Sequence, residues 1–299
     1  MTSNVTNIVP TGDLEKHGLL TSGIRLFTVP LLNALPSSVI KKMMRRSSRD
    51  ASTVVARGGS THALEAMYTR YQRRIFAKGV MRGMADAFWH HVVSQPKALR
   101  NRLKIVRNAL NSSVRALLQE RNSQGSTEPV RILSIAGGSS RSIIQMILDL
   151  KKEGITHEIE VVTLDKDQSA LDVGEKLATD ADVSSSFHWV CGNARDVQVL
   201  VPGKKFDIIE IVGLLDYFDD ERTRRLLGVA RDVMASQGTL IAANVMPNSE
   251  VPFVHKTGWP QMVYRTEKSF RNLFESSGFV DIETVVEPLK VHCVVIAKK

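Results

Sequence analysis

Cysteine is scarce in this sequence: only Cys191 and Cys293 occur in 299 residues, and each lies inside a strand-like run. Two isolated cysteines provide neither a disulfide framework nor a metal cluster, so we expect no metal site and a reducing cytoplasm as the location. Long apolar runs are also lacking, because none approaches the ~20 residues that a membrane-spanning helix needs. Residues 1–7 lack the basic start and apolar core of a secretory signal. We therefore expect a cytoplasmic globular protein without a transmembrane segment.

Acidic residues are few in the first part of the chain. Residues 1–129 hold 20 Lys and Arg against 7 Asp and Glu, whereas residues 130–299 hold 20 against 24. A strongly basic surface attracts nucleic acid, an anionic membrane or an acidic substrate, and it can equally be a well-solvated helical surface. This difference in charge indicates that the two parts of the chain do different jobs.

An apolar run at 24–32 precedes a basic cluster at 41–49. Apolar residues beside basic ones are typical of segments that lie on a membrane surface. Pro30 and Pro36, however, interrupt any long amphipathic helix here. We therefore expect a short helix that packs on the main domain and keeps its basic end in water.

Helical periodicity extends from Thr61 to Val93, and a further helix starts near Pro96. The first of these stripes comprises Leu64, Met67, Tyr68, Tyr71 and Ile75. The segment 121–129 is polar, contains helix breakers, and indicates a linker. We expect an all-helical N-terminal region over 1–125 and a second domain over 126–299.

Strand and helix patterns alternate after the linker. Strand patterns occupy 130–135, 158–164, 187–191, 206–212, 238–244, 280–286 and 291–297, and helical patterns occupy 142–153, 168–178, 220–236 and 266–277. Apolar strands separated by amphipathic helices predict a doubly wound α/β fold, with a mostly parallel sheet covered on both faces. The last two strands lie too close in sequence for a parallel crossover, and we expect them to pair antiparallel.

Turn residues suited to a nucleotide-type ligand follow four of these strands. The first strand leads through the small residues Ala136 to Ser140 into a helix, and small side chains let the backbone approach a ligand at a helix N-terminus. Asp165 ends the second strand, Gly192-Asn193-Ala194 follows the third, and Gly213 opens a turn through Tyr217 after the fourth. A nicotinamide dehydrogenase is disfavoured, because its Gly-x-Gly-x-x-Gly fingerprint is absent and Asp165 lies 27 residues beyond Gly138 rather than about 20.

This layout resembles the class I S-adenosylmethionine-dependent methyltransferases, whose seven-stranded sheet ends in a reversed strand. The resemblance covers residues 130–299. It implies that the first turn cradles the methionine half of the cofactor, that Asp165 accepts the ribose hydroxyls, and that Asn193 accepts the adenine amino group. The cofactor-binding residues implied in this way are Ser134, Ala136, Gly137, Gly138, Asp165, Gly192, Asn193, Ala194 and Gly213. Asp165 has an alternative as a helix-capping acid, and Asn193 as an ordinary turn residue.

The first turn departs from the family pattern Asp/Glu-x-Gly-x-Gly-x-Gly. Ser134 replaces the acid, Ala136 the first glycine and Ser140 the last. The requirement for small side chains is kept, but the acid that usually faces the ammonium group of the ligand is missing. A charged residue, Glu210, lies inside a central strand pattern, where a charge needs a partner or a function.

Three segments resemble a bacterial methyltransferase subgroup that includes enzymes thought to make fatty-acid methyl-ester signals. They are Leu133–Gly138, Gly213–Tyr217 and Trp259–Thr266. The resemblance implies a small-molecule substrate with an apolar body and an oxygen acceptor, either a carboxylate or a hydroxyl. The helical region 1–125 is then expected to form a substrate lid.

Methyl transfer from a sulfonium is an in-line displacement, in which positioning of the reactants supplies most of the catalysis. A carboxylate acceptor needs no base, and Arg265 offers it a bidentate fork while Tyr217 or Tyr264 offers a single donor. A hydroxyl or amine acceptor needs a base, for which His90 or His91 is the candidate, although Phe88–His91 also fits a helix face packed on the sheet.

Two other functions are compatible with the sequence. The basic residues of the N-terminal half fit an RNA methyltransferase that grips phosphates, although no recognised RNA-binding motif occurs there. The altered first turn fits a non-catalytic scaffold that binds a cofactor or a partner without turnover. An RNA methyltransferase would bind RNA with an affinity that falls steeply as salt is raised, and a scaffold would bind the cofactor without methylating any acceptor.

Overall fold

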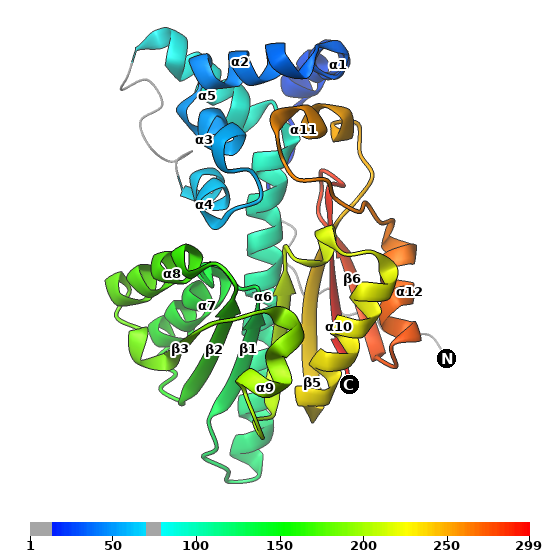
Figure 1. Cartoon of the computed structure of the whole chain (residues 1–299). Helices are drawn as coiled ribbons and strands as arrows, with labels where there is room; N and C mark the ends of the chain where they lie inside the picture. The colour runs from blue at the N-terminus through cyan, green and yellow to red at the C-terminus, as the bar shows by residue number, and fades with distance from the viewer. Residues whose placement is uncertain (1–13, 70–78) are drawn as a thin grey trace.

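Within residues 14–69 and 79–299, which the computed structural model describes, seven strands form one sheet (Figure 1). The strands are β1 (Val130–Ile135), β2 (Ile159–Asp165), β3 (Phe187–Cys191), β4 (Phe206–Val212), β5 (Met234–Val245), β6 (Val280–Val286) and β7 (His292–Lys298). Their order is β3-β2-β1-β4-β5-β7-β6, and β7 runs antiparallel to both of its neighbours. This confirms the predicted mostly parallel sheet with a reversed C-terminal strand.

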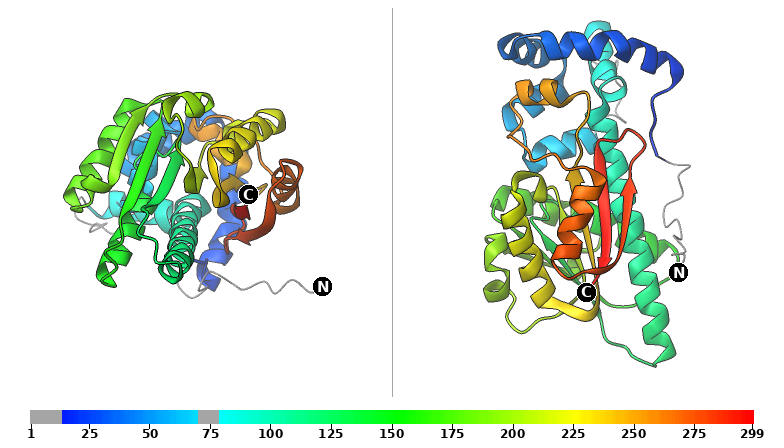
Figure 2. Two further views of the ribbon diagram at one scale, coloured as in Figure 1. Left: turned by 90° about the horizontal axis from the view of Figure 1, so that it is seen from below. Right: turned by 90° about the vertical axis from the view of Figure 1, so that its right-hand side faces the viewer.

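Each central strand is buried on both faces because its alternate side chains enter different cores. In β1, Ile132 enters one core and Leu133 the other. One face is covered by α6 (Ser94–Ser123), α7 (Arg141–Lys152) and α8 (Gln168–Asp180). The other face is covered by α9 (Val197–Leu200), α10 (Asp220–Val233) and α12 (Glu267–Ser276). The two views of Figure 2 show the helices on either side of the sheet.

A second layer of helices lies above the carboxyl ends of the parallel strands (Figure 1). We call it the helical cap, and it comprises α1 (Leu19–Ala34), α2 (Ser37–Ser47), α3 (Arg49–Arg57), α4 (Thr61–Thr69), α5 (Val80–His91) and α11 (Val251–Thr257). Its own apolar core includes Ile40, Met67, Trp89 and Phe253. Phe253 comes from the segment after β5, which sequence patterns left as an irregular stretch, so the cap is built from two distant parts of the chain.

Helix α6 joins the two layers. Leu99, near its start, packs in the core of the helical cap, whereas Ile105, Leu110 and Val114 pack against the sheet and α7. The predicted domain boundary at residue 125 assigns all of α6 to the N-terminal region. In the structure, most of α6 packs against the sheet of the second domain. The predicted stripe through Tyr71 and Ile75 lies outside the described residues.

Two further expectations can be compared with the structure. The helix expected over 220–236 ends at Val233, because Met234 already pairs with Phe206 as the start of a long β5 with a register shift. Helix α1 continues through Pro30 rather than stopping there. None of the helices in the described ranges is long and apolar enough to cross a membrane.

Candidate active site

A cavity of about 410 Å³ lies at the carboxyl ends of β1, β2 and β4. Its floor includes the turn after β1, Asp165 after β2 and Glu210 on β4, and its roof includes residues of α4 and α6. Open α/β sheets bind ligands at this edge, and pockets for small molecules have volumes of roughly 300–1,000 Å³. The cavity is therefore the candidate cofactor site.

The turn after β1 keeps the backbone of a glycine-rich turn although two glycines are replaced. Ala136 and Ser140, which stand where the family has glycine, have φ of 53° and 47°, in the left-handed region that glycine favours. A Cβ on Gly137 would lie 2.4 Å from Ser134 Oγ, and one on Gly138 would lie 2.6 Å from Thr61 Oγ1. The turn thus keeps a tight backbone in which Gly137 and Gly138 pack against Ser134 and Thr61, with backbone strain at Ala136 and Ser140.

Asp165 is fixed by two backbone amides at the edge of the cavity. Gly138 N–H donates to Asp165 Oδ2 over 2.9 Å, and Asp167 N–H donates to Oδ1 over 3.0 Å. The cap of α8 is Asp167, whose carboxylate accepts from Ser169 N–H over 3.0 Å. Hydrogen bonds from Ser169 accordingly lower the pKa of Asp167. The structure thus gives the helix-capping role to Asp167 and leaves Asp165 lining the cavity.

Glu210 places a carboxylate beside the position where the family acid is missing. Ser134 and Glu210 are register partners on β1 and β4, and Ser134 Oγ donates to Glu210 Oε2 over 2.7 Å. Ser142 Oγ, from the start of α7, donates to Oε1 over 2.5 Å. The side chain is buried yet lines the cavity, and burial raises its pKa against the effect of both serines and Arg102. The sequence marked Glu210 as an unexplained charge, but only strand pairing shows that it faces the site.

Arg102 of α6 is a buried cation at the upper wall of the same cavity. Its Nη2 donates to Tyr68 Oη over 3.1 Å, and its Nε has no hydrogen-bond partner among the described residues. No carboxylate oxygen within 14–69 or 79–299 lies within 4.0 Å of the guanidinium, the range in which other ion pairs of this chain occur. Burial opposes its charge, but Tyr68 and Asp216 raise the pKa of Arg102, so it stays protonated. A buried guanidinium with free donors favours an anionic ligand.

A second, narrower cavity of about 50 Å³ adjoins the first. Five residues line both cavities: Gly59, Leu64, Arg102, Gly213 and Tyr217. The remaining wall of the narrow cavity is mostly apolar and includes Met67, Trp89, Leu99, Phe253, Trp259 and Met262. The helical cap, α6 and the segment after α11 therefore build an apolar compartment next to the candidate cofactor site.

Two polar side chains other than Arg102 stand out in the apolar compartment. Tyr217 Oη accepts from Trp259 Nε1 over 3.0 Å, and burial together with Asp216 raises the pKa of this phenol, which is therefore neutral. His292, at the start of β7, is buried, and neither ring nitrogen has a partner among the described residues. Burial, followed by Arg102, lowers the pKa of His292 well below its ordinary value, so that it is a neutral imidazole.

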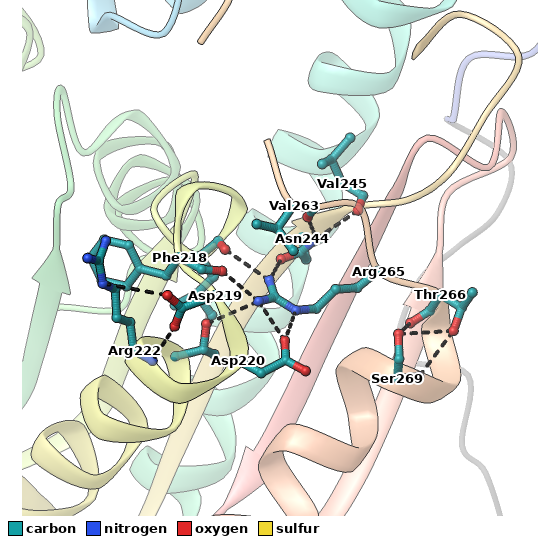
Figure 3. Close-up of polar contacts among 12 residues, drawn as sticks. Phe218, Asp219, Asp220, Arg222, Asn244, Val245, Val263, Arg265, Thr266 and Ser269 are labelled. Atoms are coloured by element: carbon teal, nitrogen blue, oxygen red, sulfur yellow. Dashed lines mark hydrogen bonds and ion pairs between the residues drawn. The ribbon is translucent and has the colours of Figure 1, made fainter. Parts of the chain in front are cut away.

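Arg265, expected to hold a substrate carboxylate, is instead engaged in structural hydrogen bonds (Figure 3). Its Nε donates to Asp220 Oδ1 over 2.9 Å, and its Nη1 donates to Asn244 Oδ1 over 2.7 Å. Further bonds reach the carbonyl oxygens of Leu215 and Phe218 over 3.0 and 2.6 Å. Arg265 lines neither cavity, and it ties the turn after β4 to α10 and β5.

We expect Arg265→Met to destabilise the fold by about 2–4 kcal/mol, because buried carbonyl and amide oxygens lose their donors. Equilibrium unfolding in urea measures this change. Arg222→Met is the matched control in the same view, since Arg222 pairs with Asp219 at an exposed position, and its loss should cost less than about 0.5 kcal/mol. Equal effects of the two substitutions would contradict a structural role for Arg265.

The structure does not bring the expected base His90 to either cavity. His90 Nε2 lies 2.8 Å from Asp50 Oδ2 inside the helical cap, and its neighbour His91 is exposed. The candidate turn at 192–194 follows β3 beside Asp165, and Gly192 N–H donates to Asp165 O over 2.9 Å. Asn193 caps the next short helix by accepting from Arg195 N–H, and the turn lines neither cavity. Its adenine-binding role stays a prediction.

Comparison with known proteins places the chain in a family. Residues 39–299 match the model of a protein family described as "Putative methyltransferase". No curated protein sequence matches the chain.

Solved structures share the fold at low sequence identity. A "putative O-methyltransferase" from Nostoc punctiforme is 18% identical, with a TM-score of 0.54 over 84% of this chain and 71% of that one. A "possible exported protein" from Bordetella parapertussis is 17% identical, with a TM-score of 0.60 over 89% and 97%. An O-methyltransferase family protein from Burkholderia thailandensis is 14% identical, with a TM-score of 0.51 over 83% and 62%.

Proposed function

The chain belongs to this methyltransferase family, whose methyl donor is S-adenosylmethionine, and we propose that it methylates a carboxylate on a small molecule with an apolar body. The observation that supports the proposal is Arg102. This buried guanidinium, with an unpartnered Nε among the described residues, lines both the candidate cofactor cavity and the apolar compartment.

The residues of the larger cavity fit S-adenosylmethionine, which supplies an electrophilic methyl group on a sulfonium when bound. The crowding around Gly137 and Gly138 leaves no room for larger side chains in the turn that is to hold the methionine half. The carboxylate of Asp165 suits the two ribose hydroxyls, and the carboxylate of Glu210 suits an ammonium group. The donors and acceptors of the site thus match the polar groups of this cofactor.

We expect Asp165→Ala to weaken S-adenosylhomocysteine binding at least 10-fold. The two ribose hydroxyls would lose their hydrogen bonds to a charged acceptor, and such a bond contributes about 1.5–3 kcal/mol. Asp167→Ala is the control, since Asp167 caps α8 and does not line the cavity. Calorimetric titration of both variants measures the difference. Equal losses of affinity would show that Asp165 acts only through the local fold.

The chain's contribution to catalysis is positioning and exclusion of water. A carboxylate is already ionised at neutral pH and needs no base, so its orientation by Arg102 and by the neutral phenol of Tyr217 is sufficient. The apolar side chains that line the narrow cavity, Met67 and Met262 among them, and the helical cap keep water from the acceptor. In this proposal the cap acts as the lid of the substrate site, and the resemblance to enzymes that make fatty-acid methyl esters supports the same acceptor.

A hydroxyl acceptor is the second candidate, and His292 is the observation that favours it. Its neutral imidazole lies in the wall of the apolar compartment, has no hydrogen-bond partner among the described residues, and is the group there that can accept the hydroxyl proton. His292→Gln would then lower methylation of the hydroxyl by about 10²–10⁴-fold. Methylation of a carboxylate would keep most of its rate in the same variant.

The test is an acceptor screen with labelled S-adenosylmethionine. Straight-chain carboxylic acids from butanoate to dodecanoate are compared with the matched alcohols, and total RNA is included as a separate acceptor. Base-labile methyl esters on the acids are the expected products. Methyl ethers alone would favour the hydroxyl candidate, and labelled RNA would favour the RNA methyltransferase. Cofactor binding without any product would favour a non-catalytic scaffold.

A further inference from the structure

Helix α1 carries a solvent-exposed apolar stripe. Leu20, Ile24, Phe27 and Leu31 follow one another at helical spacing, and all four side chains are exposed, with Leu20 and Phe27 at 80%. Val29 and Leu32, which lie outside this stripe, are buried, and Leu32 belongs to the core of the helical cap. The helix therefore buries one side and leaves a second apolar face in water. A regular apolar stripe of this kind, unlike scattered exposed residues, indicates a binding surface.

Helix α2, which follows α1 directly, carries exposed positive charge. Val39 and Met43 are exposed apolar residues one turn apart, and Lys42, Arg45 and Arg46 are exposed around them. The whole segment from Lys16 to Arg49 contains seven Lys and Arg and no Asp or Glu. We call the exposed residues of these two helices the α1–α2 face. Figures 1 and 2 show both helices at the end of the molecule that lies away from the C-terminus.

We propose that the α1–α2 face binds the surface of an anionic membrane. Apolar side chains can enter the boundary between headgroups and acyl chains while the basic side chains contact acidic headgroups, as in interfacial amphipathic helices. A second copy of the chain is a poorer partner, because this acid-free segment would meet its own positive charge. Nucleic acid would satisfy the charge but would leave the stripe of Leu20, Phe27 and Leu31 without an apolar partner.

Membrane binding would give the enzyme direct access to acceptors that dissolve in lipid. The face lies on the helical cap, which also forms part of the wall of the apolar compartment. This access to substrate rests on the proposed function. Membrane binding does not depend on the proposed acceptor, and it can be measured without any methyl transfer.

The experiment is co-sedimentation of the full chain with vesicles of pure phosphatidylcholine and of phosphatidylcholine with 25% phosphatidylglycerol. We expect binding to the anionic vesicles that weakens as salt is raised, and at least 10-fold weaker binding to the neutral ones. One triple variant, Leu20→Ser, Phe27→Ser and Leu31→Ser, removes the apolar stripe. A second, Lys42→Gln, Arg45→Gln and Arg46→Gln, removes the charge. Each should weaken binding to anionic vesicles by about 10- to 100-fold.

Two controls change exposed residues outside the face. Val199→Ser on α9 removes one exposed apolar side chain, and Lys176→Gln with Arg195→Gln and Arg222→Gln removes the same number of positive charges as the second triple variant. Unchanged melting temperatures show that all variants fold, and unchanged binding of S-adenosylhomocysteine shows that the candidate cofactor site is intact. Equal loss in controls and α1–α2 variants would overturn the proposal. So would absent vesicle binding, whether or not the face then proved to mediate self-association or RNA binding.

Discussion

Replacing Glu210 by Gln should weaken the binding of S-adenosylhomocysteine by about 10- to 100-fold, because a hydrogen bond to a charged group contributes about 1.5–3 kcal/mol. The ammonium group of the ligand would lose its carboxylate partner, while the amide of Gln can still bond to Ser134 and Ser142. Calorimetric titration measures the effect. 5′-Methylthioadenosine, which lacks the amino-acid portion, should bind the variant and the parent protein equally well.

The stability of the ligand-free protein gives an independent check on Glu210. Burial raises the pKa of this carboxyl, so the folded protein holds its proton more tightly than the unfolded chain does. The native state then binds more protons than the unfolded state between the two pKa values, and stability falls as pH rises through that range. Glu210→Gln removes this charge and should keep or raise the melting temperature at pH 7. Equal loss of affinity for both ligands, or a lower melting temperature, would point to a purely structural role.

Replacing Arg102 by Met should reduce the affinity for a carboxylate acceptor by about 30- to 1,000-fold, the effect of removing one partner of a buried charge pair (about 2–4 kcal/mol). The probe is the carboxylate that gives the highest rate in the acid series, titrated into the complex with S-adenosylhomocysteine. Fold stability should change little, because an apolar side chain of similar length replaces a buried cation that has no ion-pair partner in the described part of the chain. The Arg102→Met variant is thus expected to fold but to bind the carboxylate acceptor weakly.

Arg107→Met is the control for Arg102. Arg107 lies on the same helix, but its guanidinium pairs with Asp149 of α7 and lines neither cavity. Arg107→Met should leave the affinities for S-adenosylhomocysteine and for the carboxylate acceptor unchanged. If Arg102→Met weakened S-adenosylhomocysteine as strongly as the acid, Arg102 would bind the carboxylate of the cofactor, and the acceptor proposal would lose its main support. Unaltered affinity for the acid would also contradict it.

The order of the elements in the α/β domain could be predicted from local sequence. Buried parallel strands are continuous apolar runs, and the helices between them carry a regular apolar stripe, so both patterns depend on residues close together in the chain. Strand β1 occupies the predicted residues 130–135, and the turns after β1, β2 and β4 meet at one cavity. The small residues of the first turn and the acid ending β2 were recognisable for the same reason.

The charged residues of the site could not be predicted in this way. Glu210 comes to Ser134 because β1 and β4 are neighbours in the sheet, although the residues are 76 positions apart. Arg102 reaches the site because α6 spans both layers, and nothing in its helical spacing marks it among the other arginines of α6. The opposite error arose at Arg265, whose guanidinium, in the segment Trp259–Thr266, suggested a substrate fork but whose donors are used by the fold.

The sequence by itself determined the fold class, the edge of the sheet that forms the candidate cofactor site and the basic character of the N-terminal region, because these follow from local periodicity, turn composition and charge. Only the tertiary structure decided which charges face the cavities, which are consumed by the fold and which apolar residues stay in water. Phe27 and Leu32 of α1 are equally apolar in the sequence, but one is exposed and the other is buried. Burial and pairing are set by residues that are distant in the chain, and a local pattern cannot specify them.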